Sequence, residues 1–102
     1  MVEHKKTDNP EFDAAVEEVN KFKEGGVQVS QKNQLRLYGC YKVGCGQTVE
    51  KPGMFGGFDR KYMYEAYKQV KEDEGKSAKE AQDAYIALAN KLKSGDNSDW
   101  DA

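Results

Sequence analysis

The stretch that decides the fold reads Ser77-Ala78-Lys79-Glu80-Ala81-Gln82-Asp83-Ala84-Tyr85-Ile86-Ala87-Leu88-Ala89-Asn90-Lys91-Leu92. Ser77 and Glu80 have the spacing of a capping box, in which the serine accepts a backbone N–H three residues on and the glutamate reaches back. Behind this start, apolar residues recur at helical intervals on one face: Ala81, Ala84, Tyr85, Leu88 and Leu92. The stretch therefore predicts an amphipathic helix that ends at Gly95.

Three further segments have the same helical period. The first begins after Asn9, a good N-cap that is followed by a proline suited to the first helical turn, and it stops at Gly25-Gly26. The second begins after Ser30 and fades at Val43-Gly44-Cys45-Gly46, and the third covers about residues 60–73. No run of alternating β-branched residues indicates a strand. The chain is therefore predicted to be all-α, with four helices.

The segments outside these helices complete the predicted domain organisation. Residues 44–59 contain several glycines and a proline, which predicts a long ordered loop between the second and third helices. We expect a folded domain over residues 10–94, a disordered N-terminal segment over 1–9 and an acidic C-terminal tail over 95–102. In that tail we expect Trp100 to be solvated.

Composition excludes several classes of protein. At 102 residues the chain has room for one core, and no stretch approaches the roughly 18 apolar residues that cross a bilayer. The first residues lack the apolar region of a secretory signal. The net charge of −2 argues against a nucleic-acid binder, which concentrates a basic surplus. We expect a cytoplasmic monomer without stable membrane insertion and without a nucleic-acid partner.

Cys40 and Cys45 are the only cysteines. Their spacing matches neither a CxxC pair nor a four-ligand zinc pattern, so we expect two ordinary thiols and no metal site. The sole histidine, His4, lies in the polar N-terminal segment, far in sequence from either thiol. No catalytic residue is predicted, although a thiol-dependent redox protein that uses both cysteines is kept as an alternative.

The second predicted helix carries the most suggestive pair of side chains. Tyr38 and Lys42 are four residues apart and therefore lie on one face, one turn apart. A phenol beside an ammonium can contact a phosphate or an aromatic base, although a core tyrosine beside a solvated lysine has the same spacing. The chain holds six tyrosines, most of them on predicted inward faces. Several inward phenols suggest a cleft with an apolar body and a polar rim.

Five motifs in order resemble the acyl-CoA-binding protein family over about residues 11–93: Phe12-Asp13-Ala14-Ala15-Val16-Glu17-Glu18-Val19, Leu37-Tyr38-Gly39-Cys40-Tyr41-Lys42, Lys51-Pro52-Gly53-Met54, Tyr64-Glu65-Ala66-Tyr67 and Ser77-Ala78-Lys79-Glu80-Ala81 leading to Ala84-Tyr85-Ile86. The resemblance implies a four-helix up-down bundle of that family's type. It also implies an intracellular carrier and pool former that binds long-chain fatty acyl-CoA thioesters without performing chemistry on them and without a cofactor.

The resemblance also assigns residues. In that family, tyrosines and a lysine of the second helix bind the CoA head group, so this role passes to Tyr38, Tyr41 and Lys42, and a fourth-helix tyrosine corresponds to Tyr85. The aromatic pair of the third helix, usually tryptophans, becomes Tyr64 and Tyr67.

One expected cation is missing from the third helix. Met63 stands where the family usually carries a phosphate-binding lysine, so we include that position in the head-group site. Arg60, three residues earlier, is the expected substitute, whereas Lys61 is rotated away by roughly 200°. Val16 and Leu35 are candidate contacts for the acyl chain. A helical protein-interaction adaptor, whose inward faces serve packing alone, is the second alternative.

Overall fold

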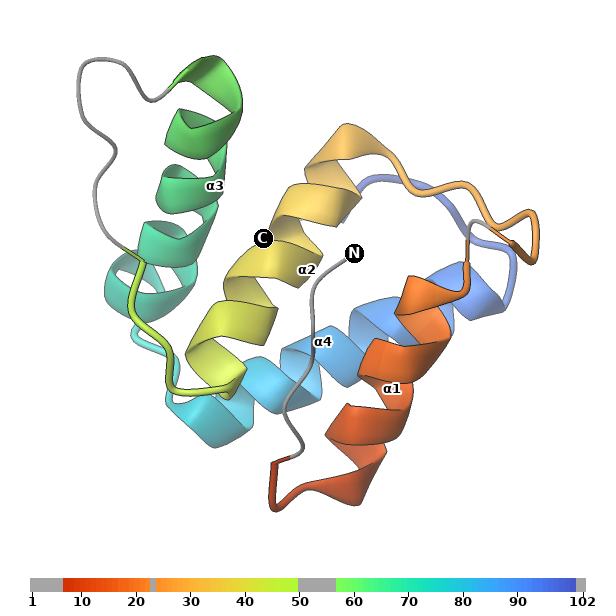
Figure 1. Ribbon diagram of the computed structural model, residues 1–102, viewed down its shortest axis with the longest axis horizontal. Coiled ribbons are helices and arrows are strands. Elements are labelled where there is room, and N and C mark those ends of the chain that lie inside the picture. The colour runs from red at the N-terminus through yellow and green to blue at the C-terminus, as the bar shows by residue number, and fades with distance from the viewer. Residues whose placement is uncertain (1–6, 23, 50–56, 101–102) are drawn as a thin grey trace.

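The computed structural model describes residues 7–22, 24–49 and 57–100, and the chain is helical throughout its regular structure there (Figure 1). Its elements are α1 (Pro10–Asn20), α2 (Gln31–Gly44), α3 (Gly57–Lys68), the short π-helix η1 (Gln69–Asp73) and α4 (Ala78–Lys93). The described ranges contain no strand. The prediction of an all-α domain with four helices is confirmed.

The helices α1, α2 and α4 begin where the sequence predicts. The side chains of Asn9 and Ser30 each accept a backbone N–H from the first turn of the helix that follows, both at 3.2 Å. Ser77 Oγ accepts the Glu80 N–H at 3.2 Å, and the Ser77 N–H donates to Glu80 Oε1 at 3.1 Å. These bonds satisfy N–H groups that have no partner within the helix.

Two helix ends differ from the prediction. α1 ends at Asn20 rather than at the glycine pair, because the Lys21 and Phe22 N–H groups bond carbonyls only three residues back, which tightens the chain into a turn. Phe22 is nevertheless buried. The third helix begins at Gly57, earlier than expected, and its final turn is the π-helix η1, which the Glu74 N–H closes by bonding the Gln69 carbonyl.

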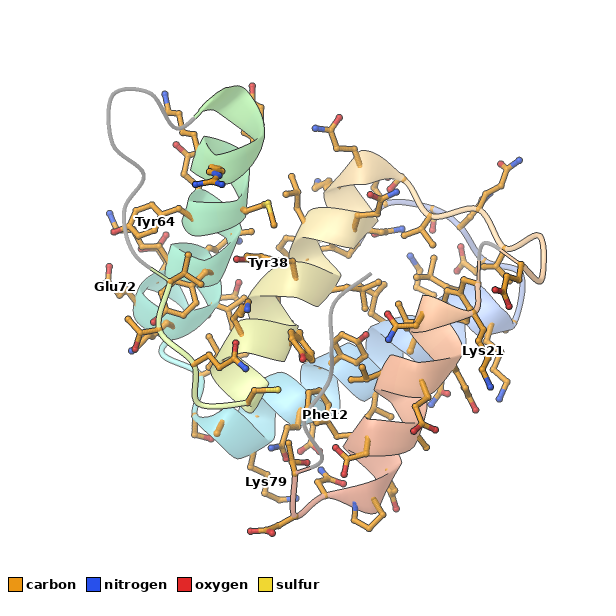
Figure 2. All side chains as sticks on the ribbon, in the orientation of Figure 1. Phe12, Lys21, Tyr38, Tyr64, Glu72 and Lys79 are labelled. Atoms are coloured by element: carbon orange, nitrogen blue, oxygen red, sulfur yellow. The ribbon has the colours of Figure 1, made fainter. Side chains whose placement is uncertain are left out.

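α2 is the central helix of the bundle. It packs against both α3 and α4, and α1 packs against α4 on the side away from α3 (Figure 1). Phe12 of α1, labelled in Figure 2, is fully buried. Its ring meets that of Tyr85 of α4 edge to face, with 5.2 Å between the ring centroids. The predicted four-helix bundle is therefore confirmed, with α2 placed so that its faces meet different neighbours.

The predicted long loop is only partly within the described residues. α2 runs to Gly44 and α3 starts at Gly57, and residues 45–49 are non-helical. Residues 50–56, which include the Lys51-Pro52-Gly53-Met54 motif, lie outside the described residues, as do residues 1–6 of the predicted N-terminal segment.

The expectation of a solvated Trp100 is wrong. Its side chain packs against the core, and its backbone N–H donates to Asn33 Oδ1 at 2.7 Å. Asn33 is fully buried, so its amide needs hydrogen-bond partners, and the tail supplies them. This interaction joins residues 67 positions apart, which is why the local polarity of the tail did not indicate it.

Candidate ligand-binding site

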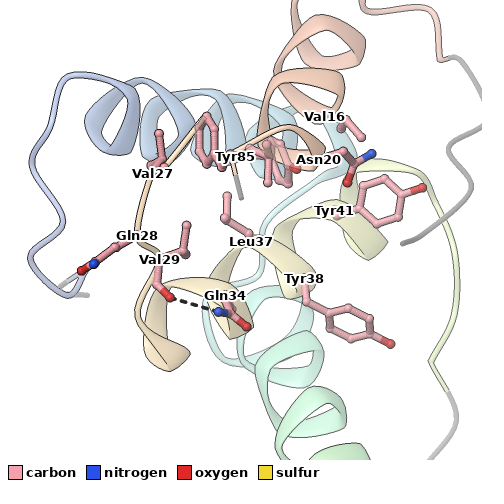
Figure 3. A pocket seen from close by; sticks show the side chains of 13 residues that line it. Val16, Asn20, Val27, Gln28, Val29, Gln34, Leu37, Tyr38, Tyr41 and Tyr85 are labelled. Carbon is pink, nitrogen blue, oxygen red and sulfur yellow. Dashed lines mark hydrogen bonds between the residues drawn. The ribbon is translucent and has the colours of Figure 1, made fainter. Parts of the chain in front are cut away.

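A cleft of about 860 Å³ opens between α1, the segment that follows it, and α2, and Tyr85 of α4 lies at its inner side (Figure 3). We call it the α1–α2 cleft. Its apolar lining consists of Val16, Val19, Phe22, Val27, Val29 and Leu37. Its polar lining consists of Asn20, Gln28, Gln34, Tyr38, Tyr41 and Tyr85. The predicted combination of an apolar body with phenol groups is present.

Two of the three tyrosines that line this cleft lie close to one another. The Tyr41 and Tyr85 rings are 6.3 Å apart, and both side chains are buried, whereas Tyr38 is half-buried. Burial raises the pKa of Tyr41 to about 12 and also raises the pKa values of Tyr38 and Tyr85. The phenols therefore keep their protons far above neutral pH and present hydrogen-bond donors rather than negative charges.

Lys42 extends over two of these rings. Its Nζ lies 5.7 Å from the ring centroid of Tyr38 and 5.7 Å from that of Tyr41, within the range of cation–π attraction. The same Nζ donates to Gln47 Oε1 at 2.8 Å. The juxtaposition of Tyr38 and Lys42 that their spacing predicts is confirmed. A positive charge thus stands next to phenols that line the cleft.

A second cleft, of about 650 Å³, lies between α2 and α3, and we call it the α2–α3 cleft. It is lined by Gln31, Gln34, Leu35, Tyr38, Tyr62 and Met63. Gln34 and Tyr38 line both clefts. In Figure 3 the Gln34 amide reaches the Val29 carbonyl, to which it donates at 3.0 Å. Tyr38 and Gln34 therefore form the boundary between the two clefts.

The structure distributes the predicted site residues over both clefts. Val16, Tyr38, Tyr41 and Tyr85 line the α1–α2 cleft, and Leu35 and Met63 line the α2–α3 cleft together with Tyr38. Arg60 and Lys61 are exposed on α3 and line neither of these two clefts. The predicted head-group and acyl-chain residues therefore do not separate into one cleft each, and their roles stay predictions.

Sequence reasoning missed part of the α1–α2 cleft. Val27 and Val29, in the segment between α1 and α2, and Leu37 of α2 all line it. A signal was present, because Val27-Gln28-Val29 alternates apolar and polar residues, a pattern typical of an extended segment with one apolar face. This alternation covers only three residues, which is too short to predict an extended segment with an inward face.

The cysteines are poorly suited to thiolate chemistry. Cys40 is buried, and burial raises the pKa of its thiol to about 11. Burial also raises the pKa of Cys45, at the end of α2. At neutral pH both groups are thiols, which are weak nucleophiles and weak metal ligands. The described part of the chain contains no group of three or more side chains suited to holding a metal ion.

The comparisons with known proteins give one match. A family model described as "Acyl CoA binding protein" matches residues 9–89, which run from the N-cap of α1 into the later turns of α4. All the described residues that line the two clefts lie within this span. Comparison with curated proteins and with solved structures gave no match. None of the helices in residues 7–22, 24–49 and 57–100 combines the length and apolar character needed to span a bilayer.

Proposed function

The chain belongs to the acyl-CoA-binding protein family, and from this premise we propose that it binds long-chain fatty acyl-CoA thioesters non-covalently and serves as their carrier and pool former in the cytoplasm. Membership of the family implies acyl-CoA binding in general. The preference for long chains and the carrier role are parts of the proposal.

The observation that carries this proposal is the position of Lys42 beside the phenols of the α1–α2 cleft. Its Nζ is equally distant from the rings of Tyr38 and Tyr41, both of which line the cleft. A lysine ammonium is a compact charge that accepts varied phosphate geometries, and phenols donate hydrogen bonds to phosphate or stack on a base. We place the CoA head group here, with Tyr85 as a further contact.

The acyl chain is proposed to cross Tyr38. Val16 and Leu35, the candidate chain contacts, lie in different clefts that share Tyr38 and Gln34. A single ligand that contacts both must therefore pass over this boundary. Burying about twelve to fourteen methylenes contributes ~10 kcal/mol gross at roughly 0.8 kcal/mol each, whereas one charged hydrogen bond contributes ~1.5–3 kcal/mol. Chain length should therefore dominate affinity.

Met63 leaves the head group without a cation that the family usually supplies at this position. Its thioether cannot neutralise a phosphate, and it lines the α2–α3 cleft beside Leu35. Arg60, exposed on α3, is proposed as the substitute cation. If Arg60→Ala binds acyl-CoA as tightly as the wild type does, Arg60 does not take the place of the missing lysine.

The same proposal excludes chemistry on the ligand. We propose that the protein is not an enzyme, requires no cofactor, binds no nucleic acid and acts as a monomer. The buried Cys40 thiol, whose pKa is raised, argues against thiol chemistry. The net charge of −2 argues against binding of nucleic acid. A double variant, Cys40→Ser with Cys45→Ser, should keep ligand binding, whereas a thiol-dependent protein would lose its activity.

Isothermal calorimetry tests the proposal directly. Palmitoyl-CoA, butyryl-CoA, free CoA and free palmitate are titrated separately into the wild-type protein. We expect palmitoyl-CoA to bind most tightly and butyryl-CoA much more weakly. Equal affinities for the two thioesters, or no binding of either, would show the proposal to be wrong. In a thermal melt, palmitoyl-CoA at a hundred times its dissociation constant should stabilise the fold by about 2.7 kcal/mol, which the adaptor alternative does not predict.

Truncation of the chain contacts tests the path across Tyr38. Val16→Ala and Leu35→Ala should each weaken palmitoyl-CoA binding more than butyryl-CoA binding, because only the longer chain reaches both clefts. Val43→Ala is the matched control, since Val43 is a buried valine of α2 that lines neither cleft. If either cleft variant behaves like the control, the chain does not cross Tyr38.

A further inference from the structure

The C-terminal tail returns from the end of α4 to the beginning of α2, where a buried asparagine holds it (Figure 1). The Asn33 side chain is fully buried, and its Oδ1 accepts the Trp100 N–H at 2.7 Å while its Nδ2 donates to the Ser98 carbonyl at 3.0 Å. Lys91 Nζ of α4 also donates to that carbonyl. One side chain thus holds two backbone groups of the tail.

The Trp100 ring covers an ion pair. The Arg36 guanidinium carbon lies 4.1 Å from the ring centroid, and Lys32 Nζ lies 5.6 Å from it. Arg36 donates through both terminal nitrogens to the Glu74 carboxylate, at 2.5 and 2.7 Å. Glu74 follows η1, so this pair ties α2 to the end of the third helical segment. A cation–π contact on a largely buried guanidinium is stronger than one in open solvent.

A small pocket beside Trp100 has two lining residues in common with the α2–α3 cleft. The ring lines a small pocket of about 190 Å³, whose other residues include Leu35 and Tyr62. Both of these residues line the α2–α3 cleft as well. A ligand in that cleft therefore contacts the same two side chains that line the pocket of Trp100.

We propose that Trp100 is a positioning residue for acyl-CoA binding: the docked tail holds Leu35 and Tyr62 in place as walls of the α2–α3 cleft, and a ligand in the cleft changes the surroundings of the indole. This inference rests on the function proposed above. Coupling between two binding events is reciprocal, so whatever the docked tail adds to ligand affinity, the ligand adds equally to docking of the tail.

The chain has a single tryptophan, so its fluorescence emission reports this site alone. Palmitoyl-CoA is titrated into the full chain while tryptophan emission and heat are followed in parallel. We expect the emission to change and to saturate at the same ligand concentration as the heat. Trp100→Ala should weaken binding about fivefold, the lower end of typical couplings between sites.

Two further variants separate positioning from general stability. Trp100→Phe keeps an aromatic ring over Arg36 and should restore most of the affinity that Trp100→Ala loses. Asp99→Asn changes the charge of the neighbouring residue, keeps the indole, and should bind as the wild type does. Circular dichroism at the titration temperature confirms that each variant is folded before its dissociation constant is compared.

The two proposals fail in different ways. If the wild type gives no heat with palmitoyl-CoA, the proposed function is wrong and this inference falls with it. If heat shows saturable binding while Trp100 emission stays constant and Trp100→Ala binds as tightly as the wild type, the positioning role alone is overturned.

Discussion

Gly39 of α2 lies directly against Ala66 of α3: a Cβ atom at position 39 would stand 2.6 Å from the Ala66 carbonyl oxygen and 2.9 Å from its carbonyl carbon. These neighbours are backbone atoms, which cannot rotate aside as the end of a side chain can. The absence of a Cβ at position 39 therefore sets how closely α2 and α3 pack, and the same two helices form the walls of the α2–α3 cleft.

Gly39→Ala should destabilise the fold by about 1–3 kcal/mol, because α3 must move outward to accept the methyl group. It should also weaken palmitoyl-CoA binding by deforming the cleft. Urea unfolding measures the first effect and calorimetry the second. Gly25→Ala is the control, since its added methyl would have no neighbour nearer than 3.7 Å. Equal stability of the two variants would contradict the close packing at Gly39.

Asn33→Asp should cost about 1–3 kcal/mol of folding stability. One carboxylate oxygen can still accept the Trp100 N–H, but the other replaces a donor and would face the Ser98 carbonyl oxygen, so two acceptors would meet in a buried place. Urea unfolding is the measurement. Asn97→Asp makes the same change at an exposed position of the tail and should have little effect. A loss of equal size in both variants would indicate a response to charge alone.

Protonation of Glu74 should lower the folding stability of the protein in acid. The hydrogen bond from Arg36 lowers the pKa of the Glu74 carboxyl below its ordinary value of 4.5. Because the carboxyl has a lower pKa in the folded state than in the unfolded state, its ionised form stabilises the fold at pH values above the unfolded-state pKa. This stabilisation is lost as the pH falls through the folded-state pKa. Urea midpoints between pH 7 and pH 2 should therefore fall less in Glu74→Gln than in the wild type. Glu24→Gln, at an exposed glutamate, should follow the wild type.

Alkaline pH should also destabilise the protein. Burial raises the pKa of Cys40 from 9.0 to about 11 and that of Tyr41 from 10.0 to about 12. The folded state keeps protons that the unfolded state releases, so the stabilisation is complete below pH 9 and is lost as pH rises through the folded values. Far-ultraviolet circular dichroism against pH should show this loss, and Cys40→Ala should reduce its earlier part. Identical alkaline profiles would rule out a contribution from Cys40.

Lys42→Ala should weaken palmitoyl-CoA binding by roughly ten- to a hundredfold, the value of one charge-assisted hydrogen bond to phosphate. Calorimetry of each protein with palmitoyl-CoA gives the comparison. The matched control is Lys79→Ala, at an exposed lysine of α4 that lies away from Tyr38 (Figure 2). If the two variants bind equally, Lys42 does not contact the head group.

Much of the fold could be predicted because its signals are local. Asn9, Ser30 and the Ser77–Glu80 pair cap their helices through bonds between residues three positions apart, and such bonds form in any context that permits the helix. The end of α1 and the π-helical turn could not be predicted, because the apolar spacing alone does not show where the backbone changes its hydrogen-bond pattern. Both turns carry a buried side chain, Phe22 and Val70.

By itself, the sequence determined the helices, their caps and the meeting of Tyr38 with Lys42, since all of these depend on residues a turn or less apart. Only the tertiary structure decided that Val16 and Leu35 lie in different clefts, and that Trp100 packs beside α2 instead of standing in solvent. Those placements depend on how closely α2 approaches its neighbours and on the hydrogen-bond partners that a buried Asn33 requires, and both arise only when distant segments pack together.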